Sequence, residues 1–345
     1  MNLNLRSVPL VVTLVLLGLI GSWFLFSLDN RTAESDDQTD ATNSADNSSI
    51  PSTPSLDRLR ATFDDANLTN STIDIKKVLH GGVAKDGIPA LTNPKLDDLS
   101  SSDAPGDTLG ILVEHNNEQR FYPYNILVSH EIVNDSIGDL DFVATFCPLC
   151  GSAIVFNRNV GGEVKEFGVS GFLFESNLIM YDRTAMPSLW SQARGEAIIG
   201  DQAGTVLDLV DFQLLTQDDV KSLHPDAKIL STDTGFSRSY NFDPYSGYED
   251  NEETFFPISV NDIRFPAKEV FFVVPSSNEQ SVAIQVGNLN RGEILKNNDL
   301  ELTIEKTVEG QLIVKNSQGE EQIGYYEMWF SWAQHHQDNG DVWSI

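Results

Sequence analysis

The feature that most constrains this chain is Val8–Leu28, a run of 21 residues without a charged side chain. At about 1.5 Å per residue, a helix of this length crosses the roughly 30 Å hydrocarbon core of a bilayer. A cleavable signal peptide is the alternative, but its apolar core is usually about 7–15 residues long and precedes a small-residue cleavage site. We therefore predict that residues 1–28 form one transmembrane helix, with a cleaved signal peptide as the alternative.

The charges around this run predict where the rest of the chain lies. Arg6 precedes the run, and the residues after it are mostly acidic. Because the positive end of a single span stays inside, residues 29–345 are expected outside the cytoplasm. The predicted location is the cell envelope, with the membrane as a partner, or the medium if the signal is cleaved.

A second segment, residues 29–55, contains almost no large apolar side chain and is predicted to be a disordered acidic tether. The whole chain carries 22 Lys and Arg against 51 Asp and Glu, a net charge of −29. Residues 1–28 contribute one base, and residues 29–55 contribute six acids and one base, which leaves −25 on the body, residues 56–345. Such a body is not expected to bind nucleic acid, because phosphate backbones are bound through Lys and Arg.

Short apolar or alternating runs between turn residues predict a mainly β body of the β-rich α+β class. The predicted strands are Leu109–Glu114, Asp141–Phe146, Ala153–Asn157, Leu178–Asp182, Val270–Val274, Leu300–Glu305 and Leu312–Asn316. Helical periodicity is rare. One predicted helix covers Gln217–Leu223, with Thr216 as its N-cap, and another covers Tyr326–Gln337.

The body also contains a faint internal repeat. Ile111–Leu127 can be aligned with Val273–Leu289, and Asp139–Phe146 with Asp299–Lys306, at offsets between 159 and 162 residues. One interpretation is a duplication that gives two related β subdomains, residues 77–250 and 251–345. The other is that unrelated strand–turn–strand units look alike.

The only two cysteines, Cys147 and Cys150, form a C-x-x-C motif between two predicted strands. This spacing lets both sulfurs meet one metal ion or each other. A metal site needs further ligands, and His130 is the best candidate nearby, while the thioether of Met180 would favour Cu(I). Copper binding is therefore the leading hypothesis, with zinc as the alternative metal.

Two other functions remain open. The cysteine pair could be a thiol–disulfide redox centre, or a structural disulfide in a protein that binds a small ligand or an envelope protein. For the binding alternative, Arg183 and Arg194 are candidate anion contacts and Trp190 is a candidate aromatic face. The sequence does not decide whether the protein is an enzyme.

Seven ordered segments together resemble the DUF3179 family. They are Lys85–Leu96, Ser129–Asp135, Ala144–Arg158, Phe167–Arg183, Ser188–Gln192, Gly195–Leu207 and the DTG…DPYSGY stretch from Asp233 to Tyr248. The resemblance extends from about Lys77 to the C-terminus and makes the CPLCG motif a family feature. It implies an exported or membrane-anchored bacterial or archaeal protein of unknown function, and it assigns no catalytic residue.

Overall fold

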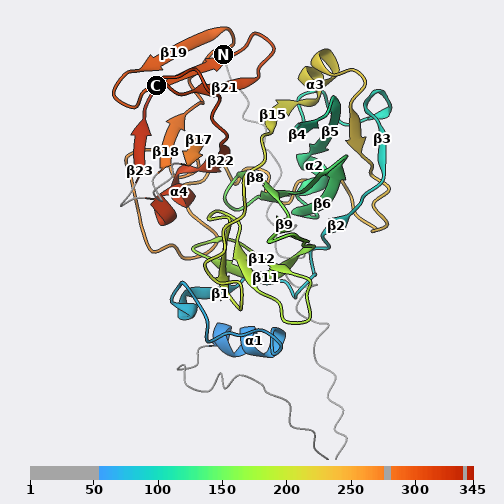
Figure 1. The fold of residues 1–345 in the computed structure, drawn as a ribbon, viewed down its shortest axis with the longest axis vertical. Coiled ribbons are helices and arrows are strands. Elements are labelled where there is room, and N and C mark those ends of the chain that lie inside the picture. Colours follow the sequence, from blue (N-terminus) through green and yellow to red (C-terminus); the bar gives the residue numbers. More distant parts are fainter. Residues whose placement is uncertain (1–53, 276–280, 337–339) are drawn as a thin grey trace, which may run out of the picture. The chain divides into compact units, whose positions relative to one another are not determined.

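The computed structural model describes residues 54–275, 281–336 and 340–345 of the chain (Figure 1). Strands greatly outnumber helices in this part, which confirms the predicted mainly β class. The predicted transmembrane helix and nearly all of the predicted tether lie outside the described residues. Within the described residues, no helix has the length and apolar character that crossing a membrane requires.

The first of three larger sheets contains five antiparallel strands in the order β1-β11-β12-β13-β14. Their bounds are Val78–His80, Phe167–Phe174, Asn177–Asp182, Leu189–Ser191 and Glu196–Ile199. Along β12, Ile179 and Tyr181 pack in a core with helix α1 (Pro54–Thr62), whereas Leu178 and Met180 belong to the main core. Since strand side chains alternate between faces, this sheet separates two cores and its central strands are buried on both sides.

The second sheet also has five strands, in the order β15-β4-β5-β16-β3, and only β5 and β16 run parallel. The bounds are Gln213–Thr216, Leu109–His115, Glu118–Pro123, Lys228–Leu230 and Leu96–Asp98. Helix α3 (Gln217–Leu223) follows β15, and the Thr216 hydroxyl accepts a hydrogen bond from the Asp219 N–H. The predicted helix and its N-cap are therefore confirmed.

The third sheet has eight strands in the order β2-β6-β7-β8-β22-β17-β18-β23. The bounds are Leu91–Thr92, Ile132–Ile137, Leu140–Cys147, Ser152–Asn157, Tyr325–Met328, Val270–Pro275, Ser281–Gln285 and Gly340–Trp343. Strands β2 and β6 run parallel, as do β18 and β23. This sheet draws strands from both predicted halves, which meet where Ala153 of β8 pairs with Tyr326 of β22.

The remaining elements are short. A hairpin is formed by β9 (Asn159–Val160) and β10 (Glu163–Val164), and a three-stranded sheet by β19, β20 and β21. The bounds of the latter are Glu293–Asn297, Leu302–Lys306 and Leu312–Lys315, and the other helical segments are η2 (Ile75–Lys77), η3 (Leu99–Ser101) and α2 (Tyr124–Leu127). The internal duplication stays a prediction. The aligned segments 111–127 and 273–289 each contain an antiparallel strand pair, β4 with β5 and β17 with β18, but the two pairs belong to different sheets.

One predicted helix begins later than expected. Helix α4 covers Trp329–His336, while Tyr325–Met328 form β22 and pair with β17. The aromatic and β-prone side chains at 325 and 326 fit an antiparallel pair as well as a helix, so pairing with β17 determines their conformation. This placement brings the residues just before α4 next to the cysteine loop.

Candidate functional site

The CPLC segment forms the tight connection between β7 and β8. Cys147 ends β7 and pairs with Ser152 of β8, and the Cys150 N–H donates to the Cys147 carbonyl oxygen at 3.1 Å. Gly151 has a φ of +54°, and a Cβ there would lie 3.0 Å from the Met328 side chain, so both the backbone and the packing favour glycine. The Met328 N–H donates to the Cys150 carbonyl oxygen at 2.8 Å, which fixes the loop against β22.

Both cysteines are free thiols, with exposed fractions of 1% for Cys147 and 0% for Cys150. Burial raises the pKa of Cys147, but hydrogen bonds from the Cys150 thiol and from the backbone of Leu178, Cys150 and Leu149 bring that pKa below its ordinary value. Burial, together with the hydrogen bond to Cys147 and its charge, raises the pKa of Cys150 well above its ordinary value. The pair therefore favours one thiolate, on Cys147, beside one thiol.

The Cys150 thiol has a second acceptor within reach, the carbonyl oxygen of Ser176 at 3.2 Å. Ser176 and Glu175 form the turn between β11 and β12, with φ values of +67° and +50°. Two left-handed residues match the twist of a two-residue hairpin, yet neither is glycine, so the turn is held in a disfavoured conformation. Glu175 is fixed by Lys77, whose ammonium lies 3.0 Å from its carboxylate.

Two buried acids lie close enough to feel the charge of Cys147. Burial and the charge of Cys147 raise the pKa of Glu131 well above its ordinary value. Burial also raises the pKa of Glu327 to about 8, with a contribution from Cys147, although the hydroxyl groups of Ser331 and Tyr325 oppose the shift. Both acids therefore favour the neutral form more strongly than an exposed carboxyl group does, and Glu327 is largely protonated near neutral pH.

Several buried polar atoms around this loop have no hydrogen-bond partner of ordinary geometry among the described residues. They are both carboxylate oxygens of Glu327 and the hydroxyl groups of Ser176, Tyr248 and Ser331. The Ser331 hydroxyl lies near enough to Cys150 and Glu327 to lower the pKa of both. Buried polar groups are normally paired, so this concentration of unpaired ones makes the loop a candidate functional site.

A fully paired polar network holds the other side of the loop. The Gln192 amide donates to the Thr145 hydroxyl at 3.0 Å and accepts from the Ser152 hydroxyl at 2.7 Å and from the Asn177 amide at 2.9 Å. All four side chains are buried. This network fixes β7, β8 and the turn after β11 relative to one another, and so determines the position of the dithiol.

Of the predicted metal ligands, the structure brings Cys147 and Cys150 together, while His130 is engaged by other partners. His130 is buried, but its Nδ1 is 2.7 Å from the Pro89 carbonyl oxygen and its Nε2 is 2.7 Å from the Tyr240 hydroxyl. Met180 is buried on β12 and faces the main core. Across the described parts of the chain, no group of three or more His, Cys, Asp or Glu side chains is arranged to hold a metal ion. The described residues therefore give no support to the predicted copper or zinc centre, which stays a prediction.

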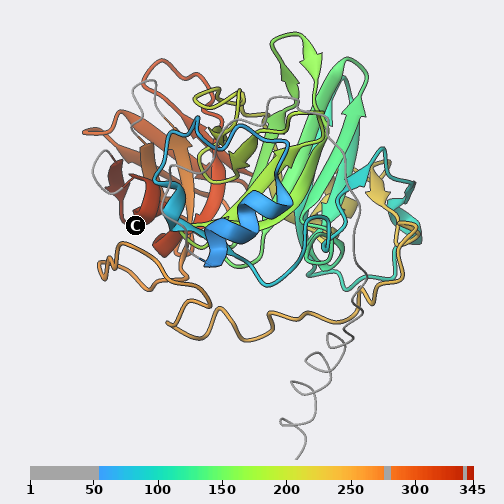
Figure 2. The ribbon, with the colours of Figure 1, turned by 90° about the horizontal axis from the view of Figure 1, so that it is seen from below.

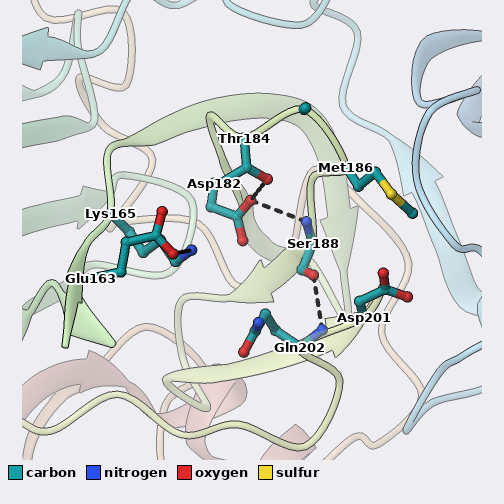
Figure 3. A pocket seen from close by; sticks show the side chains of 9 residues that line it. Glu163, Lys165, Asp182, Thr184, Met186, Ser188, Asp201 and Gln202 are labelled. Carbon is teal, nitrogen blue, oxygen red and sulfur yellow. Dashed lines mark hydrogen bonds and ion pairs between the residues drawn. The ribbon is translucent and has the colours of Figure 1, made fainter. Parts of the chain in front are cut away.

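Trp190 does not offer a free aromatic face, which corrects the prediction. Its side chain is fully buried, and its indole N–H donates to Asp182 at 2.9 Å. Asp182 also accepts from the Thr184 hydroxyl at 2.7 Å and from the Ser188 N–H at 3.2 Å (Figure 3). These bonds brace the loop after β12 at the edge of a cavity of about 310 Å³.

The two predicted arginine contacts are already paired with acids. Arg183 lies between Glu166 at 2.7 Å and Asp86 at 2.8 Å, on the wall of a second cavity of about 440 Å³. Arg194 forms an ion pair of 2.5 Å with Glu196. An anionic ligand would have to displace a carboxylate before it could bind either guanidinium. Arg183 and Arg194 therefore stay predicted anion contacts, but each is already neutralised by an ion pair.

Comparison with known families identifies the group to which the chain belongs. The family model described as a protein of unknown function (DUF3179) matches residues 85–322, well over half of the chain. The chain belongs to the DUF3179 family. No curated protein and no solved structure matches it.

Sequence reasoning found the cysteines of this DUF3179 protein but missed most of their surroundings. Glu131 and Ser176 lie in two of the motifs that carry the family resemblance, and Tyr248 ends a third. Membership of DUF3179 motifs was thus an available signal for these three. Glu327 and Ser331 lie beyond the matched region, and no pattern in the sequence singled them out.

Proposed function

We propose that this protein carries out thiol–disulfide exchange with a disulfide-bonded partner through Cys147 and Cys150. The observation that carries the proposal is the pair of free, buried thiols whose pKa values are shifted in opposite directions. In such a pair the thiolate is the nucleophile and the neighbouring thiol resolves the mixed disulfide.

The proposed reaction balances in two steps. The Cys147 thiolate attacks one sulfur of a partner disulfide, the S–S bond of the partner breaks, and the leaving thiolate takes the proton of Glu327. The Glu327 carboxylate then accepts the proton of Cys150 by way of the Ser331 hydroxyl, and the Cys150 sulfur attacks Cys147. The second partner thiolate leaves and is protonated by water, so the partner gains two electrons and the cysteine pair becomes a disulfide.

The same chemistry runs in reverse if the partner is a dithiol. We propose that the reaction takes place in the cell envelope, on the basis of the uncharged run Val8–Leu28. Disulfide-bonded proteins form and persist in such compartments, which supplies the class of partner that the reaction requires.

The test is a redox titration of the purified full-length chain in thiol–disulfide buffers, with alkylation and mass spectrometry to count free thiols. We expect a reversible two-electron transition above about −300 mV, the range of labile rather than structural disulfides. In Cys150→Ser, a mixed disulfide should accumulate on Cys147, whereas Cys147→Ser should form far less. Absence of any reversible transition would overturn the proposal.

The same preparations test the weaker proposal of copper or zinc binding. Metal content is measured in the wild-type chain and in Cys147→Ser. Stoichiometric metal in the wild-type chain that is lost in the variant would contradict the redox proposal and favour a metal centre at the cysteines. The remaining ligands would then have to come from a rearrangement of the surrounding loop. We expect no stoichiometric metal, because both ring nitrogens of His130 are engaged elsewhere.

A further inference from the structure

Residues 232–268, here named the cover segment, join β16 to β17 without forming a helix or strand. In Figure 2 the segment is the gold-to-orange coil that runs along the lower edge. A connection this long without secondary structure is uncommon and usually functional. The cover segment contributes Tyr245 and Tyr248, both of which feel the charge of Cys147.

Near its start, the cover segment is attached to the residues beside Glu131. The Tyr240 hydroxyl is hydrogen-bonded to His130 Nε2 at 2.7 Å and to the Thr234 hydroxyl at 2.6 Å. The Asn125 amide donates to the Tyr240 carbonyl oxygen at 3.2 Å. His130 thus serves as an attachment point for the cover segment.

At the other end, Lys268 is enclosed by the cover segment itself. Its ammonium donates to the carbonyl oxygens of Tyr248 at 2.6 Å and Glu253 at 2.8 Å, and also to that of Asn251. The three hydrogens of the ammonium therefore each have an acceptor. The same nitrogen lies 3.5 Å from the centre of the Tyr248 ring, a cation–π contact.

Tyr248 is the link between this lysine and the thiols. It is 6% exposed and belongs to the same core as Cys147 and Cys150. Phe255 stacks on its ring at 4.5 Å and is itself 61% exposed. Tyr248 thus contacts an exposed aromatic residue and is also close enough to the cysteine pair to feel the charge of both thiols.

We propose that the cover segment controls access to the dithiol, and that Lys268 is a positioning residue that keeps Tyr248 in the closed position. Both thiols are buried, so a reacting disulfide reaches Cys147 only after part of the protein moves. The sheets around the cysteines are held by continuous strand pairing. The cover segment is instead held to the rest of the described protein mainly by side-chain hydrogen bonds, at Tyr240, Ser259 and Val260 among others, and by one backbone bond, from the Phe330 N–H to the Ala267 carbonyl oxygen. Local opening is expected where the fewest backbone hydrogen bonds must break.

The test is the rate at which iodoacetamide alkylates Cys147 and Cys150 in the reduced full-length chain, followed by mass spectrometry. Lys268→Met keeps much of the side-chain volume but cannot donate to the three carbonyl groups. Tyr248→Ala leaves the carbonyl groups in place and removes the covering ring. The matched control is Lys296→Met, which replaces an exposed lysine on β19.

We expect each cover variant to raise the alkylation rate at least about tenfold, a change expected for local opening, while Lys296→Met leaves it unchanged. Lys268→Arg, which retains charge and donors, should restore most of the protection. Equal rates in wild type, Lys268→Met and Tyr248→Ala, with cooperative unfolding retained, would overturn the proposal. If Lys268→Met unfolds the chain, Tyr248→Ala alone decides the question.

Alkylation requires access to a thiol but no partner disulfide. The cover proposal can therefore hold when the redox titration fails. It can also fail when the titration succeeds. The two proposals are thus distinguished by separate measurements on separate sets of variants.

Discussion

Two buried acids in this protein, Asp182 and Glu327, differ in how their carboxylates are paired. The Asp182 carboxylate accepts hydrogen bonds from Thr184, Ser188 and Trp190. The Glu327 carboxylate is fully buried, and neither of its oxygens has a partner of ordinary geometry among the described residues. The first arrangement stabilises a loop, whereas the second leaves a desolvated proton-binding group beside two thiols.

Whether a buried carboxylate is hydrogen-bonded helps to distinguish a structural role from a functional one. A paired buried carboxylate lowers the energy of one conformation, and its removal is expected to damage the fold. An unpaired one costs stability in its charged form, so its presence calls for another explanation, such as a role in proton transfer.

The largest expected effect is the pH dependence that Glu327 imposes on stability. Its pKa is about 8 in the folded protein, against an ordinary value of 4.5. The folded state therefore binds a proton that the unfolded state has lost between these two pH values, and its free energy of unfolding falls as pH rises through that window. Relative to Glu327→Gln, the wild-type chain should lose roughly 5 kcal/mol in total as the pH rises from well below 4.5 to well above 8, from the shift at about 1.4 kcal/mol per pKa unit.

Urea unfolding of both chains across this pH range measures the difference. The glutamine variant is the control because its neutral side chain does not titrate while every other acid is retained. At pH 4.5 the two chains should differ by about 1 kcal/mol or less, since a protonated glutamic acid and glutamine are similar in shape and charge. Parallel curves at all pH values would show that Glu327 has the same pKa in the folded and the unfolded chain, which would contradict the prediction.

Asp182→Ala should have the next largest effect, and at all pH values where the wild type is folded. The substitution leaves the Trp190 indole N–H, the Ser188 N–H and the Thr184 hydroxyl without their acceptor. Buried donors without acceptors cost about 1–3 kcal/mol each, so we expect a loss of about 3–5 kcal/mol in the free energy of unfolding. Asp182→Asn, which keeps one acceptor oxygen, should lose less. A loss below about 1 kcal/mol would contradict the bracing role.

The contrast between these acids also shows what the sequence could predict. Strands at Asp141–Phe146 and Ala153–Asn157 follow from local patterns, and the cysteine loop between them follows from the strands. The neighbours of that loop do not, because Glu327 and Ser331 come from more than 170 residues away through the pairing of Tyr326 with Ala153. His130 is a different case, since closeness in sequence suggested a metal ligand, whereas its hydrogen-bond partners in the structure are Pro89 and Tyr240.

The smallest of the three effects concerns Trp190, which the sequence suggested as a ligand contact. Trp190→Phe removes the indole N–H that donates to Asp182 and some buried volume, but keeps an aromatic ring in the core. We expect a loss of about 2–3 kcal/mol in the free energy of unfolding, from one lost hydrogen bond and incomplete packing. The redox potential of the cysteine pair should stay within about 30 mV of wild type, a shift that corresponds to 1.4 kcal/mol. Unchanged stability together with a changed potential would place Trp190 with Glu327 rather than with Asp182, because an effect confined to the dithiol is what the functional side of the comparison predicts.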